Sequence, residues 1–139
     1  MSFREISAWV MGALMCGMGA HYLETYLAAA RALDGAPPPL ELFTPYAVCV
    51  VVASIVIQVV LASFAPKDAD RPPDERERPL LWRAGHWAGL VQGGFCVAAV
   101  LYVGHSGDTA ILFHLIVGGL IVSQIVEYGL QIAFLRFGA

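Results

Sequence analysis

Four long apolar runs are the feature that most constrains how this chain folds. They lie at 7–30, 42–65, 84–103 and 110–134. Each is long enough to cross the hydrocarbon core of a bilayer, which takes about 20 helical residues. The runs lack the apolar–polar alternation of membrane strands, of which a barrel needs at least about eight. The sequence therefore predicts an all-α polytopic membrane protein, with one four-transmembrane-helix bundle formed by residues 1–139.

The composition supports this class and excludes several others. Of the 139 residues, 58% are hydrophobic and 14% are charged, whereas soluble domains average roughly 45–50% and ~25%. The net charge of −3 argues against a nucleic-acid-binding protein, which needs a basic face. The sequence has no glycine-rich phosphate loop, no nucleophile elbow and no zinc-protease motif, so we do not expect an enzyme.

Prolines and small polar residues mark the predicted helix boundaries. Three prolines at 37–39 separate the first two helices. Thr44 followed by Pro45 has the form of an N-cap with proline at the first helical position. Before the fourth helix, Asp108 or Thr109 is the expected cap.

The distribution of basic residues favours one orientation in the membrane. Seven of the eight lysines and arginines lie before the first helix, between the second and third, or after the fourth, and only Arg31 lies on the other side. Cytoplasmic loops are enriched in these residues. We therefore expect the loop 66–83 and both termini to be cytoplasmic, in a bacterial inner (plasma) membrane. The first run continues through Ala30, too long for a cleaved signal peptide, which favours a retained anchor.

The loop between the second and third helices carries charges of both signs. Residues 66–79 mix acids and bases almost evenly. This pattern indicates either a solvated elbow or a docking surface for a cytoplasmic partner, and it is unlike a polybasic lipid-binding patch.

The same loop carries a resemblance to a known family. Its segment 72–78 reads Pro-Pro-Asp-Glu-Arg-Glu-Arg, and the fourth helix ends with Glu127-Tyr128-Gly129 and then Arg136-Phe137-Gly138. Both segments resemble a family of small, uncharacterised bacterial four-helix membrane proteins with a cytoplasmic Pro-x-Asp-Glu-Arg-x-Arg loop. The resemblance implies the four-helix topology, and it implies no activity.

Small residues recur at every fourth position on two helices. The third helix has Gly85, Gly89 and Gly93, and the first has Gly12 and Cys16 on a similar ridge. Such ridges let helices approach closely in lipid. They predict either packing of the first helix on the third or a homodimer seam along the third helix, with a homodimer or another membrane-protein partner expected overall.

The three cysteines, Cys16, Cys49 and Cys96, all fall within the apolar runs. They lack the spacing of metal ligands or of a disulfide framework. We therefore expect them to be small buried packing residues.

Four polar residues are expected in the outer half of the membrane. They are His21, Glu24, His105 and His114. Three imidazoles and a carboxylate suit Zn²⁺ or another divalent metal, and His21 with His114 would suit haem b if they faced each other. The alternative, which we expect, is hydrogen bonding at the membrane interface without any cofactor.

A second polar layer is expected in the half nearer the cytoplasm. Its members are Gln58, Gln92, Ser123, Gln124 and Glu127, with Gln131 one turn further on. Ionisable groups at this depth are costly and are functional candidates by default. One hypothesis makes Glu127 the proton- or cation-binding carboxylate of a minimal transporter or channel. The alternative is polar glue that fixes the register of neighbouring helices.

The function that the sequence favours is an oligomeric interaction or regulatory subunit of the inner membrane. The small-residue ridges would form its contacts within the bilayer, and the loop 66–79 would meet any cytoplasmic partner. A proton- or cation-coupled transporter or channel based on Glu127 is the first alternative. A metal- or haem-binding membrane protein is the second.

Overall fold

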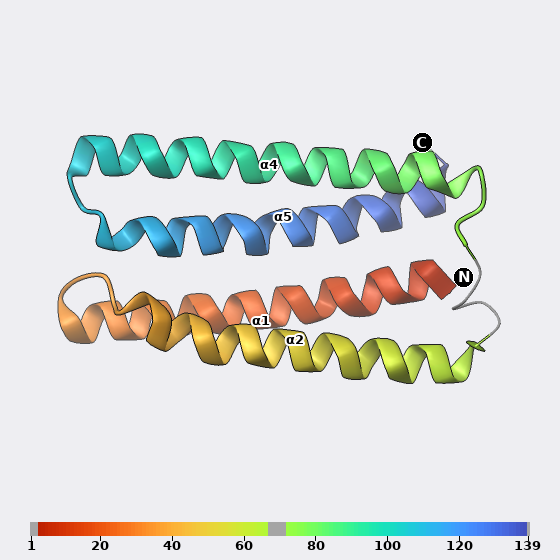
Figure 1. Cartoon of the computed structure of the whole chain (residues 1–139), viewed down its shortest axis with the longest axis horizontal. Coiled ribbons are helices and arrows are strands. Elements are labelled where there is room, and N and C mark those ends of the chain that lie inside the picture. Colours follow the sequence, from red (N-terminus) through yellow and green to blue (C-terminus); the bar gives the residue numbers. More distant parts are fainter. Residues whose placement is uncertain (1–2, 67–71, 139) are drawn as a thin grey trace.

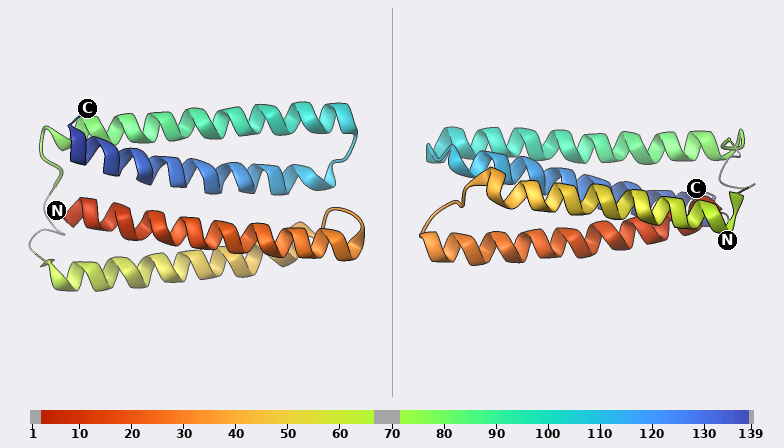
Figure 2. Two further views of the ribbon diagram at one scale, coloured as in Figure 1. Left: turned by 180° about the vertical axis from the view of Figure 1, so that it is seen from behind. Right: turned by 60° about the horizontal axis from the view of Figure 1, so that its bottom comes forward.

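A computed structural model describes residues 3–66 and 72–138 of the chain. Its long helices are α1 (Phe3–Leu33), α2 (Pro39–Phe64), α4 (Glu77–Ser106) and α5 (Ala110–Phe137). Each is long and apolar enough to cross a membrane, which confirms the all-α fold of an integral membrane protein with four spans. The N-terminus and the C-terminus lie at one end, here called the terminal end, and the α4–α5 connection lies at the other, the turn end (Figures 1 and 2).

The helices extend beyond the apolar runs that predicted them. They contain 26 to 31 residues and are therefore about 39–46 Å long, whereas the hydrocarbon core is about 30 Å thick. Residues 77–83, assigned above to the loop 66–83, belong to α4. The backbone N–H groups of Glu77 and Arg78 both donate to the carbonyl of Asp74, and an acid in the first turn complements the helix dipole. Residues 67–71 of the charged loop 66–79, which was interpreted as a solvated elbow or a docking surface, lie outside the described residues.

The second helix begins before the Thr44-Pro45 pair that was expected to start it. Pro39 is its first residue and Pro45 lies inside it. Pro45 lacks the backbone donor that would bond the carbonyl of Glu41, four residues earlier. Glu41 is exposed, so its carbonyl can bond a polar solvent group, and the helix continues through the proline.

The turn between α4 and α5 follows the sequence closely. Gly107 has a positive φ of 73°, and its N–H donates to the carbonyl of Val103 at the end of α4. The Asp108 carboxylate accepts a hydrogen bond from the N–H of Ala110 at 3.0 Å, and Thr109 is the N-cap residue of α5. Of the two predicted cap residues, Asp108 supplies the side-chain hydrogen bond, whereas Thr109 occupies the N-cap position without a side-chain capping bond.

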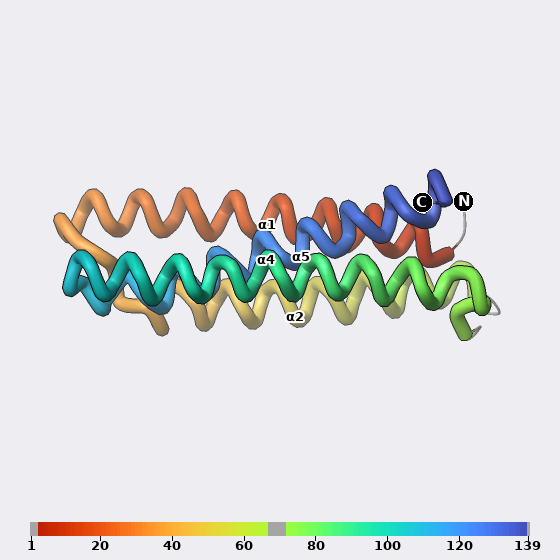
Figure 3. The backbone as a smooth tube through the Cα atoms, turned by 90° about the horizontal axis from the view of Figure 1, so that it is seen from above, coloured from red at the N-terminus to blue at the C-terminus, as the bar shows by residue number. Residues whose placement is uncertain are grey.

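α5 is the centre of the packing. α4 and α1 both pack along it, and α2 packs along α1 with only a small contact to α5, so the helices follow one another in the order α4, α5, α1, α2 (Figure 1). Between the described residues, α4 makes no comparable contact with α1 or α2. Figure 3 shows α2 and α4 on the same side of α1. α2 and α4 therefore do not pack along each other, and in this sense the bundle is open between them.

α4 meets α5 through alanines rather than through its glycine ridge. Ala84, Ala88 and Ala99 are almost completely buried. A Cβ atom added at Gly89 or Gly93 would meet no atom within 4 Å. The expected packing of the first helix on the third is therefore wrong, because the glycine ridge lies beside the line of contact with α5.

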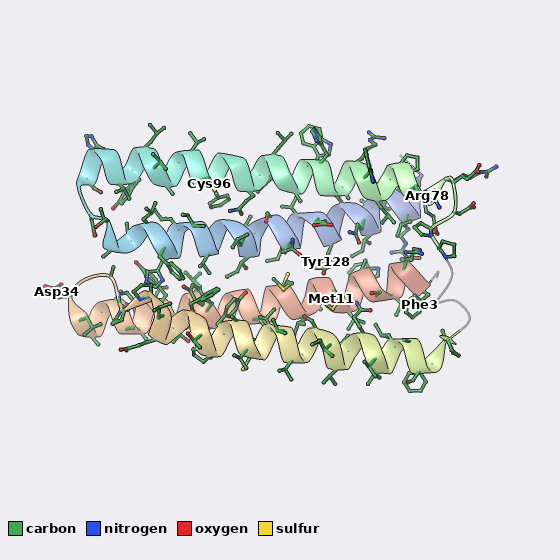
Figure 4. All side chains as sticks on the ribbon, in the orientation of Figure 1. Phe3, Met11, Asp34, Arg78, Cys96 and Tyr128 are labelled. Carbon is green, nitrogen blue, oxygen red and sulfur yellow. The ribbon has the colours of Figure 1, made fainter. Side chains whose placement is uncertain are left out.

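The first helix also packs on α5. Met11 and Met15 are buried, and a Cβ added at Gly12 would lie 3.3 Å from the Cβ of Tyr128 on α5. Figure 4 shows Met11 and Tyr128 in the region where these two helices face each other. Gly12 thus lies at a contact of α1 with α5, whereas Cys16 is exposed.

The prediction that the cysteines are buried is wrong for two of them. Cys16 and Cys49 are exposed and Cys96 is half-buried. Cys49 lies on α2, which has no buried residue among those the structure describes. In an open bundle, most of the surface of a peripheral helix is left to lipid.

Candidate functional site

A cavity of about 390 Å³ lies at the terminal end, and residues of all four helices line it. Its polar lining consists of Arg4, Ser7, Gln58, Glu127 and Gln131. Its apolar and aromatic lining consists of Phe3, Ala8, Leu81, Trp82 and Tyr128. Glu127 is the one acidic residue of this described lining. Because it lies within a membrane span, it is a functional candidate by default.

The Glu127 carboxylate is held by two amides of its own helix. Its Oε1 accepts a hydrogen bond from Nε2 of Gln131 at 3.1 Å, and its Oε2 accepts one from Nε2 of Gln124 at 3.4 Å. Both glutamines are on α5, one turn after and one turn before the acid. Among the described residues, no hydrogen bond joins the carboxylate to another helix. Glu127 is therefore positioned by α5 alone.

α4 leaves room for this carboxylate. A Cβ added at Gly85 would lie 3.9 Å from Oε1 of Glu127, so the glycine backbone borders the acid. Gly85 was predicted as a helix-packing residue, together with Gly89 and Gly93. The structure places Gly85 beside Glu127 and leaves the other two in open space.

Gln58 reaches the same cavity but acts as a link between helices. Its Nε2 donates to Oγ of Ser7 at 2.9 Å and so joins α2 to α1. This contact has the character of polar glue, which was the alternative considered for the whole layer. Gln58 and Ser7 thus form the hydrogen bond between helices, whereas the described hydrogen bonds of Glu127 stay within α5.

The structure does not bring Gln92 or Ser123 to this cavity. Nε2 of Gln92 lies 3.5 Å from Sγ of Cys96 on the same helix, and its buried Oε1 has no hydrogen-bond partner in the described chain. Ser123 is buried, and its hydroxyl donates to the carbonyl of Leu120 at 3.0 Å. Both residues lie nearer the turn end than Glu127, in the packed part of the bundle.

Two ion pairs lie at the terminal end near the cavity. Nε of Arg4 is 3.3 Å from the carboxylate of Glu77 and joins α1 to α4, and Nε of Arg136 is 4.0 Å from the carboxylate of Glu5 and joins α5 to α1. Arg4 lines the cavity, and the carboxylate of Glu77 balances its charge. The carboxylate of Glu127 is therefore the group that gives the cavity its electrostatic character.

Sequence reasoning missed several residues of this cavity. Ser7 is a lone hydroxyl near the start of the first helix, and only its contact with Gln58 gives it a role. Trp82 and Tyr128 are aromatic residues near helix ends, where aromatic belts occur in most membrane proteins. Their position next to Glu127 in the cavity was the missing information.

At the turn end, His114 is a buried structural residue rather than a free ligand. Its Nδ1 is 2.8 Å from the hydroxyl of Tyr22, and its Nε2 is 2.9 Å from the carbonyl of Pro37. A carbonyl only accepts hydrogen bonds, so Nε2 carries the proton and donates it, and Nδ1 accepts from the tyrosine hydroxyl in the neutral ring. Tyr26 packs on the imidazole with ring centroids 4.8 Å apart. His114 thus ties α5 to α1 and to the proline-rich connection.

The other residues expected beside His114 lie elsewhere. His21, Glu24 and His105 are all exposed, and His21 lines a separate small groove between α1 and α2. Within residues 3–66 and 72–138, no three His, Cys, Asp or Glu residues are grouped as metal ligands would be. His21 precedes Tyr22 by one residue, about 100° around the helix. When Tyr22 turns towards His114, His21 therefore turns away from it.

A larger groove at the turn end has a different character. It has a volume of about 400 Å³, and its walls come from α1, α5 and Phe95 of α4. Tyr22, Tyr26 and His114 lie at this groove, Tyr22 and His114 are engaged with each other, and the remaining lining is apolar. It therefore offers little chemistry beyond contact with hydrocarbon.

No family model, curated protein or solved structure matches this chain. The four-helix layout implied by the resemblance of the charged loop is observed in the structure.

Proposed function

We propose that this protein is a minimal cation- or proton-coupled membrane transporter or channel that binds its cation at Glu127. The observation that carries the proposal is the arrangement of the carboxylate. Both of its hydrogen-bond donors come from α5, while the acid lines a cavity bordered by all four helices.

The hydrogen-bond capacity of Glu127 supports a binding role. A carboxylate offers about four acceptor positions, and Gln124 and Gln131 occupy two of them. The two amides hold the oxygens in place and leave the remaining positions to a ligand. A residue whose role was to hold helices together would instead form a hydrogen bond with a neighbouring helix, as Gln58 of α2 does with Ser7 of α1.

We further propose that the terminal end faces the cytoplasm of a bacterial inner membrane. The described basic residues at this end are Arg4, Arg76, Arg78, Arg83 and Arg136, whereas Arg31 lies in the last turn of α1 at the opposite end. This distribution follows the enrichment of basic residues on the cytoplasmic side. The Glu127 cavity would then open near the cytoplasmic surface.

Proteoliposomes test the proposal directly. Vesicles with an imposed inside-negative potential and an internal pH dye report proton uptake by the wild type, by Glu127→Gln and by the matched control Glu24→Gln. Glu24 is the other acid within an apolar run, and it is exposed near the turn end. We expect uptake above that of empty vesicles in the wild type and the control, and uptake at the empty-vesicle level in Glu127→Gln. Equal uptake in the wild type and Glu127→Gln would overturn the proposal.

Two observations favour a second candidate, an oligomeric interaction or regulatory subunit. α2 has 26 residues and none of them is buried, and the glycine ridge of α4 is open at Gly89 and Gly93. A second copy or another membrane protein would cover these faces. Native mass spectrometry in detergent tests this candidate: we expect a dimer for the wild type and a monomer for Gly89→Ile. A monomeric wild type would contradict self-association.

A further inference from the structure

We infer, on the basis of the proposed function, that the ligand of the Glu127 cavity is an amphiphilic organic cation that enters sideways from the bilayer between α2 and α4. Three properties of the cavity lead to this ligand class: its size, its aromatic lining and its open side.

The size of the cavity and its few charged groups favour a molecule over a bare metal ion. Its volume of about 390 Å³ lies in the range of small-molecule sites, roughly 300–1,000 Å³. A hard metal cation would require about six or more oxygen ligands at short distances. Glu127 supplies the only carboxylate among the described residues that line this cavity. The part of the chain that the structure describes has no group of three potential metal-binding side chains.

Aromatic side chains give the cavity a surface for an organic cation. Trp82 of α4 and Tyr128 of α5 both line it, with Phe3 of α1 at the same end. Indole and phenol faces attract positive charge, and they also pack against apolar groups. A ligand with a cationic centre and an apolar body would satisfy both Glu127 and these rings.

The charge balance selects a cation over an anion. Arg4 also lines the cavity, but its guanidinium is 3.3 Å from the carboxylate of Glu77. The carboxylate of Glu127 has amide donors rather than a basic partner. An anionic ligand would meet this charge at close range, whereas a cationic one would neutralise it.

The open side of the bundle supplies the route. Within the described residues α2 and α4 make at most a slight contact with each other, yet Gln58 of α2 and Trp82 of α4 both line the cavity. Trp82 is 86% exposed, so this part of the lining is accessible from outside the bundle. A ligand that partitions into the bilayer can therefore reach Glu127 from the side.

Equilibrium binding of radiolabelled tetraphenylphosphonium to the full chain in lipid nanodiscs tests the inference. We expect saturable binding to the wild type, at least tenfold weaker binding to Glu127→Gln and severalfold weaker binding to Trp82→Leu. The matched controls are Glu24→Gln and Trp87→Leu. Trp87 is an exposed tryptophan of the same helix that lies outside the cavity lining, and both controls are expected to bind as the wild type does.

The neutral analogue triphenylphosphine oxide and the hydrophilic cation Rb⁺ are added as unlabelled competitors. Neither is expected to displace tetraphenylphosphonium from the wild type. Equal binding to the wild type and Glu127→Gln, or equal weakening in Trp82→Leu and Trp87→Leu, would overturn the inference. Glu127-dependent proton uptake without probe binding would overturn the ligand class and leave the proposed function standing. Circular dichroism of each variant shows whether it has folded, and Glu127→Asp, which keeps the charge, is expected to retain part of the binding.

Discussion

Replacing Gly119 with alanine is expected to force α4 and α5 apart at a point where they lie close together. A Cβ atom added at Gly119 would lie 2.6 Å from Cβ of Phe95, 3.0 Å from Cγ of Phe95 and 3.2 Å from Oε1 of Gln92. Cβ of Phe95 is attached directly to the α4 backbone, so no rotation of the side chain moves it away. One helix has to retreat by about 0.8 Å before this contact reaches 3.4 Å, the lower limit of ordinary van der Waals contact.

The size of the effect follows from a comparison with the neighbouring glycine. Alanine is favoured over glycine in a helix by about 1 kcal/mol, and this gain applies equally to Gly118→Ala and Gly119→Ala. A Cβ added at Gly118 would meet no atom within 4 Å. The difference between the two variants is therefore the overpacking cost alone, which is typically about 1–3 kcal/mol.

The two variants can be compared by equilibrium unfolding in mixed micelles with increasing dodecyl sulfate, followed by circular dichroism. We expect Gly119→Ala to have a free energy of unfolding about 1–3 kcal/mol below that of Gly118→Ala. If Gly119→Ala is as stable as Gly118→Ala or more stable, the close approach of α5 to Phe95 is refuted.

Two further predictions concern hydrogen bonds between helices. His114→Ala leaves a tyrosine hydroxyl and a backbone carbonyl at the turn end unpaired and is expected to destabilise the protein by about 1–3 kcal/mol for each buried group. The exposed His105→Ala is expected to change stability by less than about 0.5 kcal/mol in the same unfolding assay, and equal effects would contradict the structural role of His114. A double-mutant cycle of Ser7→Ala and Gln58→Leu is expected to give a coupling energy of about 0.6 kcal/mol, and additive effects would show that the α1–α2 hydrogen bond contributes nothing.

The fold was predictable because lipid leaves the backbone few choices. Every N–H and C=O group within the hydrocarbon must be paired internally, so each long apolar run becomes a helix. The helix ends were less predictable, since apolarity reports only the part of a helix that lies in hydrocarbon. Residues 77–83 form the first turns of α4, although they lie outside the apolar run that predicted this helix. Pro45 lies inside α2 rather than at its start.

Within the site, the acid was easier to predict than its surroundings. Glu127 is conspicuous because it interrupts an apolar run, and a simple count of residues gives its depth. The rotation of each helix about its axis is not encoded in that count. Gln58 and Gln92 have similar expected depths, yet only Gln58 lines the cavity. Rotation also decides that α4 meets α5 through Ala88 rather than through Gly89, one residue further on.

The openness of the bundle and the charge of Glu127 are physically connected. If α2 and α4 closed over the cavity without a ligand, the carboxylate would be buried with two amide donors and, among the described residues, no basic partner of its own, because Arg4 is paired with Glu77. Burial of an unpaired ion costs several kcal/mol. The open side keeps the carboxylate next to a space that polar or cationic groups can occupy, and thereby avoids this cost. Glu127→Gln removes the charge at nearly constant shape, so this variant is expected to be at least as stable as the wild type. A loss of transport or of probe binding in Glu127→Gln would then reflect the missing charge rather than a damaged fold.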